Sequence, residues 1–586
     1  MLLHNSDVAK MFKKIADLLE VKGENPFRVR AYRRASMIID SLPRSLEKMI
    51  EENEDLTLFE GIGKDLAQQI KNVVMSGSHP KLTELEKEFP AGINDLIKIN
   101  GIGPKKLKIL FDQLKINNLL DLEIAIKHKQ LRQLPGFGIK TEENILKELK
   151  RVALAEKRMH YKDAEKVIIP FVKYLSEVSG VKKVEIAGSL RRKKETVGDV
   201  DLLAICNNTS AITKKFVEYQ YVKETISHGK TRSSVILKND LQVDLRVVPE
   251  KSYGAALLYF TGSKEHNVAI RNLALKKGMK INEYGVFREY KSDEKNGQKN
   301  KIEKRVAGKS EEEIYALFAM PYIEPELREN QGEIQAAGKH SLPNLIQEKD
   351  IRGDLHCHTT ASDGKNTIEE MGIAAKEKGY EYLAITDHTP SIRIAGGPAT
   401  FKDYEKHLEN IDLANLNLKE ITLLKGAEVE ILEDGKLDLP NYVLKKLDII
   451  VCSVHSHFKL SVEKQTERIL RALDNNYFQI LGHPTGRLIG ERDPYEVDLE
   501  RILKEIKLRG KAVELNSFPS RLDLKDIYLK MAKDMGVRVV ISTDSHSREM
   551  LHLIKYGIDQ ARRGWLEAND VVNTLKLSDL KKILSS

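Results

Sequence analysis

Nine His, Asp and Glu side chains between residues 350 and 586 could together hold metal ions. His356 and His358 are two residues apart, a spacing that places both side chains on one face of a strand. Asp363 follows in the next turn, and later apolar runs end in six more candidates: His388, Glu428, His455, His483, Asp544 and His546. A single His at a strand end is usually structural or solvated. Nine such ligands without a thiolate predict a centre for Mn²⁺, Zn²⁺ or Fe²⁺.

A second group of carboxylates lies in the middle of the chain. Asp199 and Asp201 share one face of a predicted strand, and Asp244 lies between apolar residues of a later strand. Neighbouring carboxylates repel unless cations neutralise them, and Mg²⁺ prefers hard oxygen ligands completed by water and phosphate. A lone Asp-x-Asp usually marks an exposed strand edge. With Gly188 and Ser189 at a turn just upstream, the pattern favours a nucleotidyltransferase core.

A short Gly-apolar-Gly element occurs three times in the first 150 residues. Each copy opens a predicted helix, and the glycine pairs are Gly61 with Gly63, Gly101 with Gly103, and Gly136 with Gly138. Such turns leave backbone N–H groups unobstructed at a helix N-terminus, where a phosphate can bind. One copy alone would be an ordinary turn, but three copies predict helix-hairpin-helix contacts with a nucleic-acid backbone.

The elements that must position these residues follow from periodicity. Residues 1–150 show short helical patterns, and a sheet is predicted from 165 to 250. Helices return over 251–320, and the Pro-, Glu- and Gln-containing stretch 321–349 is typical of a linker. From 350 onward, apolar strands alternate with helices, which predicts βα units with the metal ligands at the C-terminal strand ends.

The charge distribution agrees with this division. Residues 1–349 hold 61 basic and 49 acidic side chains, whereas residues 350–586 hold 35 and 38. A basic front half suits a polyanion. Three distant cysteines argue against a disulfide framework, and no apolar run approaches the roughly 18–20 residues of a membrane span. Because the amphipathic N-terminus does not resemble a signal peptide, we expect a soluble, intracellular protein.

The middle section closely resembles the palm of family X DNA polymerases, and Tyr259-Phe260-Thr261-Gly262-Ser263 resembles the thumb motif of that family. The resemblance implies that Asp199, Asp201 and Asp244 are catalytic and hold two Mg²⁺ or Mn²⁺ ions. The positions that match the family's nucleotide site are Gly188, Ser189, Arg192, Gly198, Tyr259, Phe260, Gly262, Asn267 and Arg271. For binding of a DNA end it adds Arg28, Tyr32, Arg33 and Arg34 to the glycines of the three turns.

Residues 350–586 closely resemble the polymerase and histidinol phosphatase (PHP) domain, a phosphoesterase family that folds as a distorted seven-stranded barrel. That resemblance implies a trinuclear site held by all nine ligands named above. Cys357 should point to the opposite face, and His457 could either assist the site or lie on the surface. Arg393 and Arg487 are candidates to bind the scissile phosphate.

The expected architecture is therefore multidomain: helical helix-hairpin-helix domains, an α+β nucleotidyltransferase palm with a thumb, and a C-terminal α/β PHP barrel. The predicted boundaries are 1–85 for a DNA-end-binding domain, 86–155 for fingers with a helix-hairpin-helix, 156–250 for the palm, 251–320 for the thumb, 321–349 for the linker and 350–586 for the PHP domain.

One position departs from the family pattern. Members that remove a 5′-deoxyribose phosphate use a Lys on the helix after the first Gly-x-Gly, and that position is Gln69 here. A carboxamide cannot form a Schiff base. Lys64 and Lys71 are nearby, but Lys71 faces another side of the helix. We therefore expect lyase activity to be weak or absent.

The resemblance covers nearly the whole chain and implies a gap-filling DNA polymerase for base excision repair. Its PHP domain would add a metal-dependent 3′-5′ exonuclease or 3′-end-processing activity, with abasic-site endonuclease activity left open. An alternative is a 3′-end-processing nuclease whose polymerase half mainly binds DNA; a binding module with silent sites is disfavoured by the intact ligands. The expected partners are gapped or primer-template DNA and dNTPs. We expect a cytoplasmic, nucleoid-associated monomer.

Overall fold

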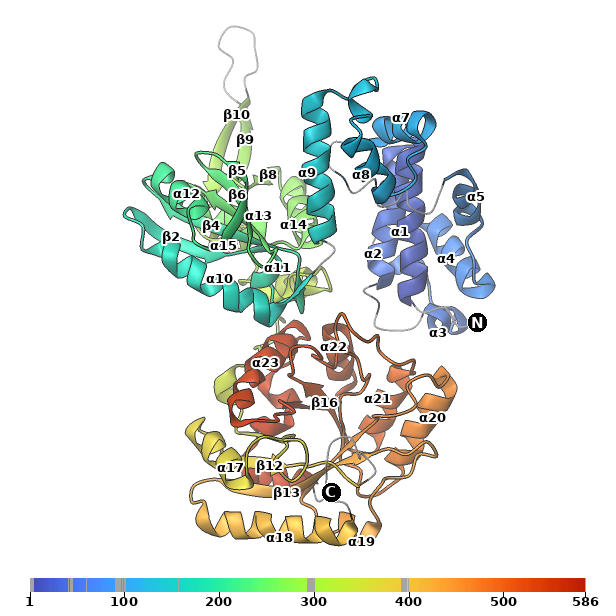
Figure 1. Cartoon of the computed structure of the whole chain (residues 1–586), viewed down its shortest axis with the longest axis vertical. Coiled ribbons are helices and arrows are strands. Elements are labelled where there is room, and N and C mark those ends of the chain that lie inside the picture. Colours follow the sequence, from blue (N-terminus) through green and yellow to red (C-terminus); the bar gives the residue numbers. More distant parts are fainter. Residues whose placement is uncertain are drawn as a thin grey trace. The chain divides into compact units, whose positions relative to one another are not determined.

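The computed structural model describes residues 5–584 except 41, 43–45, 60, 90–95, 97–98, 100–101, 156–157, 292–300, 391–397 and 399. The chain forms two compact units, Met1–Arg158 and Met159–Ser586. Figure 1 shows helices throughout the first unit and sheets flanked by helices in the second. Among the described residues, no helix is long and apolar enough to cross a membrane.

The first unit is helical, as its periodicity predicts. Its helices are α1 (Asn5–Lys22), α2 (Pro26–Asp40), α3 (Leu46–Glu51), α4 (Lys64–Ser76), α5 (Pro80–Glu88), α7 (Pro104–Leu114), α8 (Leu119–Lys127) and α9 (Ile139–Ala155). The three predicted turns lead directly into α4, α7 and α9. Gly63 and Gly103 cap their helices with extended backbone, and Ile62, Ile102 and Phe137 between the glycines are buried. Each turn is therefore anchored by its apolar middle residue, while the second glycine stays at the surface.

The palm is a five-stranded sheet in the order β2-β4-β7-β6-β5. Its strands are β2 (Val181–Ile186), β4 (Asp199–Cys206), β5 (Val222–His228), β6 (Arg232–Leu237) and β7 (Gln242–Val247). A small ladder joins β1 (Met159–His160) to β3 (Thr196–Val197), and the helices are α10 (Tyr161–Ser176), α11 (Gly188–Arg191) and α12 (Thr209–Val217). Strands β4 and β7 are parallel neighbours, and this pairing brings the predicted carboxylates together.

The thumb region contains more than the helices predicted for it. Helices α13 (Tyr253–Thr261), α14 (Lys264–Lys276) and α15 (Glu311–Ala316) accompany a three-stranded antiparallel sheet of β8 (Met279–Asn282), β9 (Gly285–Lys291) and β10 (Lys301–Ala307). The sequence prediction missed these strands because charged residues interrupt their apolar alternation.

The prediction of a linker over 321–349 was wrong. The segment contains α16 (Glu333–Gly338), and the apolar side chains of Ile323, Leu327 and Leu345 are buried in the core that it shares with the thumb. The charged residues of this segment suggested an exposed chain, whereas in the fold several of them are buried and paired with opposite charges. Arg328 is fully buried and paired with Glu311.

The C-terminal region is a seven-stranded parallel sheet in sequence order, curved into a nearly closed barrel. Its strands are β11 (Gly353–Asp354), β12 (Tyr382–Ile385), β13 (Thr422–Glu430), β14 (Ile449–Ser453), β15 (Ile480–Leu481), β16 (Ala512–Asn516) and β17 (Arg538–Ser542). The helices are α17 (Ile368–Glu377), α18 (Phe401–Asn417), α19 (Asn441–Leu444), α20 (Val462–Leu473), α21 (Leu499–Leu508), α22 (Asp526–Met535), α23 (Ile554–Arg563) and α24 (Leu577–Leu584).

Polar contacts draw the first and last strands of the barrel together. Asp354 at the end of β11 accepts hydrogen bonds from the backbone and hydroxyl of Thr543, and the His358 amide donates to the Ser545 carbonyl at 2.8 Å. A buried carboxylate needs such partners. Their effect is to bring the ligand segments after β11 and β17 side by side.

Candidate active sites

The palm carboxylates meet across the β4–β7 ladder. Asp201 and Asp244 are directly paired, and Asp199 lies two residues before Asp201 on the same strand. Burial and the neighbouring charges of Asp199 and Asp244 raise the pKa of Asp201 to about 7. Crowding of this kind is relieved by divalent cations, whose charge favours the ionised carboxylates. The donor set therefore fits the metal ions that the sequence implies.

Gly188 turns the chain beside these carboxylates. Its φ is +65°, and a Cβ atom there would lie 2.8 Å from Oδ2 of Asp201. The backbone amide of Ala187 donates to the Asp201 carbonyl at 2.8 Å. A glycine is needed at this position, and the turn holds the Gly188–Arg192 segment against the carboxylate site.

Arg192 joins this segment to the thumb motif. Its Nη1 donates to the Thr261 carbonyl, and its Nε donates to Oε1 of Glu329 at 3.0 Å. Gly262, with φ at +72°, leaves room for this guanidinium, because a Cβ atom would approach its Nη1 to 3.0 Å. The structure thus brings together three of the predicted nucleotide-binding positions, Gly188, Arg192 and Gly262.

The remaining nucleotide candidates lie around the same motif. Asn267 on α14 donates to the Tyr259 carbonyl at 2.7 Å, and Arg271 one turn later is exposed. Phe260 packs under the guanidinium of Arg246, with the guanidinium carbon 4.3 Å from the ring centroid. The two remaining candidates precede the carboxylates in sequence: Ser189 follows Gly188, and Gly198 comes directly before β4.

In the barrel, the metal-ligand candidates converge on Glu428 at the end of β13. Its carboxylate oxygens lie 2.8 Å from Nε2 of His483, 3.0 Å from Nδ1 of His388, and 3.1 Å from Nε2 of His455. The Nε2 atoms of His356 and His358 are 3.4 and 3.6 Å away. One fully buried carboxylate therefore lies beside five histidines, which follow four different strands.

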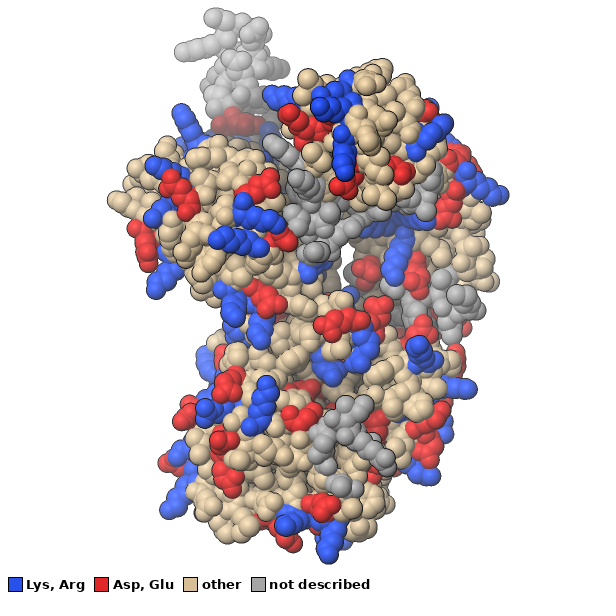
Figure 2. All heavy atoms as spheres, in the orientation of Figure 1, with Lys and Arg blue, Asp and Glu red and all other residues tan. Residues whose placement is uncertain are grey.

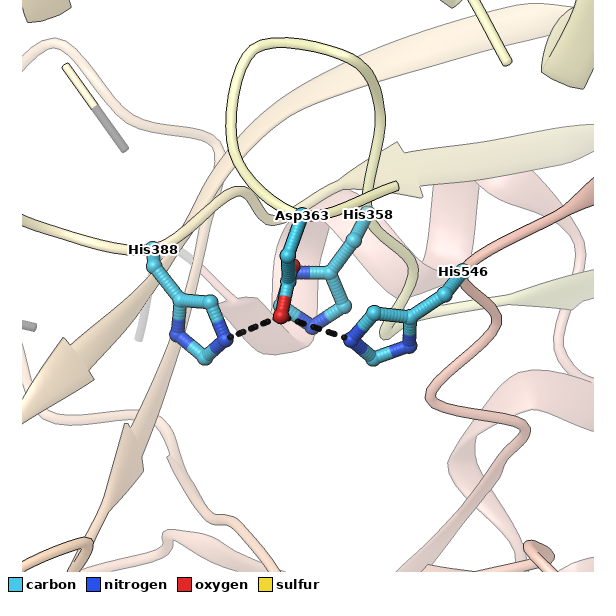
Figure 3. Close-up of side chains that lie close together, drawn as sticks. All are labelled: His358, Asp363, His388 and His546. Carbon is cyan, nitrogen blue, oxygen red and sulfur yellow. Dashed lines mark ion pairs between the residues drawn. The ribbon is translucent and has the colours of Figure 1, made fainter. Parts of the chain in front are cut away.

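Asp363 forms a second focus on the loop after β11. Figure 3 shows its carboxylate between His388 and His546, with His358 behind it. The Asp363 Oδ2 atom lies 3.2 Å from Nε2 of His546 and 3.6 Å from Nε2 of His388. Asp544 completes the site, with Oδ1 at 3.2 Å from Nε2 of His358. All nine predicted ligands thus belong to one cluster.

The cluster fits metal ions by an independent criterion. Three overlapping groups each offer ligand atoms within 4.8 Å of one another: His358, Asp363, His388 and His546; His356, His358 and Glu428; His388, Glu428 and His455. Although carboxylate oxygens lie nearby, several buried ring nitrogens form no hydrogen bond of good geometry with any described residue, including Nε2 of His356 and both ring nitrogens of His358. Buried nitrogens without a partner are costly, and metal coordination would satisfy them.

The charges of the cluster agree with this interpretation. Burial by itself would lower the pKa of His388, but Glu428 and Asp363 raise it to about 10. Burial opposes ionisation of Glu428 as well, yet the surrounding histidines hold its pKa well below the usual range. The carboxylates thus favour positive charge at the positions where cations would bind.

Carboxylates outside the predicted ligand set orient the ligands. Glu514 on β16 accepts from Nδ1 of His356 at 2.7 Å, and Glu430 lies 2.8 Å from Nδ1 of His455. Asp387, next to His388, lies 3.1 Å from Nε2 of His407 and accepts hydrogen bonds from Thr359. Carboxylates behind ligating histidines fix the ring orientation. An acidic residue inside an apolar strand, as in Ala512–Asn516, was the available sequence signal.

Other predicted residues have different surroundings. Cys357 is buried on the opposite face, as expected, and its thiol donates to the Ala384 carbonyl at 2.9 Å. His457 is half exposed beside Glu433. Arg487 forms an ion pair with Glu195 of the palm at 2.8 Å and also donates to the Leu522 carbonyl, so these two groups engage its guanidinium. Arg393 lies outside the described residues.

The DNA-binding candidates lie in the first unit. Gly63, Gly103, Gly136 and Gly138 are exposed, and no described residue lies within 4 Å of a Cβ atom built at any of them. Gly61 and Gly136 adopt positive φ. Gly101 lies outside the described residues. Arg28 is exposed, and Arg34 packs against Gly61.

Two of the DNA-end candidates have partners inside the helical unit. The hydroxyl of Tyr32 donates to Oε1 of Gln69 at 2.7 Å, and Arg33 pairs with Asp17 at 2.7 Å and with Glu20 at 2.8 Å. The predicted lyase position is thus occupied by a hydrogen-bonded carboxamide.

Models of known families match successive parts of the chain. A helix-hairpin-helix domain matches residues 3–79, a SAM-like helix-hairpin-helix tandem 93–151, a DNA polymerase beta palm 158–276, a DNA polymerase beta thumb 256–329 and a PHP domain 354–518. The matches follow the domain order expected from the sequence.

Whole-protein comparison gives the same result. The DNA polymerase/3′-5′ exonuclease PolX of Bacillus subtilis (strain 168) is 36% identical over 584 residues, which cover 99% of both chains. A probable phosphatase of Caldanaerobacter subterraneus is 36% identical over 204 residues, or 33% of this chain and 75% of that protein. A probable phosphatase of Thermoanaerobacter sp. (strain X514) is 33% identical over a stretch of the same length. The phosphatase similarity spans a third of the chain, whereas the PolX similarity spans nearly all of it, and the chain therefore belongs to the PolX family of DNA polymerases with a C-terminal PHP domain.

Proposed function

We propose that this protein fills gaps in DNA during base excision repair and trims 3′ ends with a metal-dependent 3′-5′ exonuclease in its PHP domain. The observation that carries the proposal is the presence of two complete ligand sets in one chain. Asp199, Asp201 and Asp244 meet on the palm, and nine His, Asp and Glu side chains meet in the barrel. The name of a relative that is 36% identical over 99% of this chain, the DNA polymerase/3′-5′ exonuclease PolX of Bacillus subtilis, gives both activities for that protein.

At the palm, we assign Asp199, Asp201 and Asp244 to hold two divalent cations, Mg²⁺ or Mn²⁺. Arg192 would bind the triphosphate of a dNTP, together with the backbone of Gly188 and Ser189. Tyr259, Phe260 and Gly262 would lie along the sugar, with Asn267 and Arg271 toward the incoming base and the template. The primer 3′-oxygen then forms a bond to the α-phosphorus, and pyrophosphate leaves.

In the barrel, the nine clustered residues would hold Mn²⁺, Zn²⁺ or Fe²⁺, and Glu514 and Glu430 would keep His356 and His455 in ligating orientations. At both sites, bound cations supply charge neutralisation at the phosphate and a lower pKa for the attacking hydroxyl or water. The donor set suits hydrolysis of a terminal phosphodiester or phosphomonoester, which would clean the 3′ end that the palm extends.

The finer assignments belong to the same proposal. We retain the domain boundaries given above, with 321–349 as a packed connection in place of a linker, and assign gapped or primer-template DNA as the substrate. The exposed glycines of the three turns and Arg28 would contact the DNA backbone. We further propose that the protein acts as a monomer at the nucleoid.

Two double variants separate the activities. Asp199→Ala with Asp201→Ala should abolish nucleotide incorporation on a one-nucleotide gapped duplex and spare removal of 3′-terminal nucleotides. His356→Ala with His358→Ala should have the opposite effect. Each pair serves as the control for the other, and survival of both activities in either double variant would refute the two-site assignment. A wild-type protein that degrades 3′ ends but incorporates no dNTP would instead support the alternative of a dedicated nuclease.

A further inference from the structure

Arg563, the last residue of α23, reaches from the barrel region to the nucleotide site of the palm. Its Nη1 donates to the Arg192 carbonyl at 2.7 Å and to Oε1 of Glu329 at 3.1 Å. The same Glu329 oxygen accepts from Nε of Arg192 at 3.0 Å. Arg563 therefore contacts both the backbone of Arg192 and the carboxylate that orients its side chain.

The contact is buried and charged. The side chain of Arg563 is only 2% exposed, and those of Arg192 and Glu329 are 13% and 14% exposed. The other terminal nitrogen of Arg563 donates to the Asp526 carboxylate. In such surroundings a fork of charge-assisted hydrogen bonds fixes geometry more tightly than a surface pair would.

The sharing of Glu329 also affects the charge that Arg192 offers to a ligand. Burial would raise the pKa of Glu329, but Arg563, Lys194 and Arg192 hold it at about 2, so the group stays ionised. Because its one negative charge is divided among several cations, Arg192 is only partly neutralised. A partly neutralised guanidinium can bind an anionic triphosphate without losing the carboxylate that holds it in place.

We propose that Arg563 is a positioning residue for DNA synthesis: from the PHP side, it fixes the backbone and side chain of Arg192 so that the palm can bind the triphosphate of a dNTP. The inference rests on the proposed function, since it takes Arg192 as the triphosphate ligand. It goes beyond that function by making part of the polymerase's nucleotide affinity a property of the barrel region.

Steady-state gap filling with the full-length protein tests the proposal. Arg563→Met should raise the KM for dNTP by about tenfold, the effect of losing roughly one charge-assisted hydrogen bond, with kcat within about twofold. Arg563→Lys keeps the charge but cannot bond Arg192, Glu329 and Asp526 together, so its KM should rise by a smaller factor of about three. Nuclease activity on single-stranded 3′ ends should remain in both variants.

Arg562→Met is the matched control. Arg562 precedes Arg563 on α23 but bonds Glu326 and the Ile346 carbonyl, away from the nucleotide site, so its KM should match that of the wild type. In an Arg192→Met background, Arg563→Met should add no further increase, because both changes act through one group. If the two substitutions together raised the KM for dNTP by the product of their separate factors, the proposal would be overturned.

The remaining outcomes are also decisive. A wild-type or lowered KM in Arg563→Met overturns the proposal. If that variant loses nuclease activity and thermal stability, Arg563→Lys decides, and a wild-type KM there overturns it. Failure of the wild-type protein to incorporate any nucleotide would refute the proposed function itself, which is a separate result.

Discussion

Single carboxylates behind the metal ligands should control the barrel site as strongly as the ligands do. Glu514 accepts from Nδ1 of His356 and also from the hydroxyl of Ser542 at 2.6 Å, so the ring presents Nε2 to the cluster. Glu514→Gln should reduce bound metal and nuclease rate by about 10- to 100-fold and leave gap filling unchanged. Metal content per chain and degradation of a labelled 3′ end provide the measurements. Glu505→Gln, on the surface of α21, is the control, and an unchanged metal content in Glu514→Gln would contradict this role.

The carboxamide at Gln69 makes a second residue-scale prediction. Because an amide has no nucleophilic amine, borohydride should trap no covalent adduct between the protein and an incised abasic duplex. Gln69→Lys would place an amine beside Tyr32 and His79, where partial burial favours its neutral, nucleophilic form, and should increase trapping. If the wild-type protein gave as much trapped adduct as a competent lyase, another lysine would be forming the Schiff base.

Residue types and spacing were sufficient to predict which nine side chains of the barrel lie together in one cluster. The sequence did not predict the ion pair of Arg487, because its partner Glu195 is 292 residues away. Nor did it predict the hydrogen bond of Glu514, because the imidazole it accepts from belongs to His356, just after β11. Local patterns identify groups that need a partner, but only the fold determines which partner they have.

At the scale of elements, substitutions in the glycine turns can test the proposed contact with the DNA backbone separately from the stability of the helical unit. Gly138 has ordinary φ, and a Cβ atom there would have no described residue within 4 Å, whereas Gly136 has φ at +81°. Gly138→Ala should weaken binding to gapped DNA by about threefold without lowering the melting temperature. Gly136→Ala should lower the free energy of unfolding by about 1 kcal/mol. Fluorescence anisotropy and thermal melting distinguish the two, and wild-type DNA affinity for Gly138→Ala would remove this turn from the interface.

The ion pairs that join palm and thumb should contribute to the free energy of unfolding in a pH-dependent way. Glu311 on α15 pairs with Arg191 at 2.7 Å and with Arg328, which is fully buried. Burial opposes its ionisation, but Arg328 and Arg191 lower its pKa to about 2 from an ordinary 4.5. A depressed carboxyl pKa stabilises the fold above the unfolded value, so this contribution is complete above pH 4.5 and is lost as pH falls toward 2.

Glu311→Gln should therefore lower the free energy of unfolding by about 3 kcal/mol at pH 7, because it leaves Arg328 buried without its counter-charge. The difference between variant and wild type should shrink as the pH falls from about 4.5 toward 3. Thermal melts across this range measure it, with the exposed Glu312→Gln on the same helix as the control. A difference that stays constant with pH would mean that Glu311 is not ionised in the fold.

The ion pairs between palm and thumb also explain why the sequence of residues 321–349 was mistaken for a linker. Pro, Glu and Gln are typical of exposed segments, and the sequence alone does not reveal that Glu333 contacts the buried His266 or that Arg328 contacts Glu311. The alternating βα pattern of the barrel, by contrast, predicted its strands well, because strands such as β12, β14 and β16 are buried on both faces.

For the molecule as a whole, net charge is a weak guide to the DNA path. Basic and acidic side chains are interspersed on the face shown in Figure 2, and the formal excess is only +9. If the proposed function holds, steering of a polyanion would depend on local groups such as the glycine turns and on cations bound at the two sites, whose charge the formal count omits.

Metal binding should therefore stabilise one part of the molecule and not the other. The barrel ligands belong to the unit Met159–Ser586, and the described residues of Met1–Arg158 have their own hydrophobic core. A ligand that binds only the folded state stabilises the unit that holds it, by about 2.7 kcal/mol at a concentration 100 times its Kd.

Calorimetry should accordingly resolve two unfolding transitions, of which chelation lowers one by roughly 3 °C and leaves the other unchanged. Restored Mn²⁺ should reverse the shift, and His356→Ala with His358→Ala should abolish the response to metal while keeping both transitions. Because Arg563, Arg487 and Tyr161 join the palm and barrel regions, the palm should unfold in the metal-sensitive transition. Rapid hydrogen exchange in the palm strands at the metal-insensitive temperature would show instead that the palm unfolds independently of the barrel.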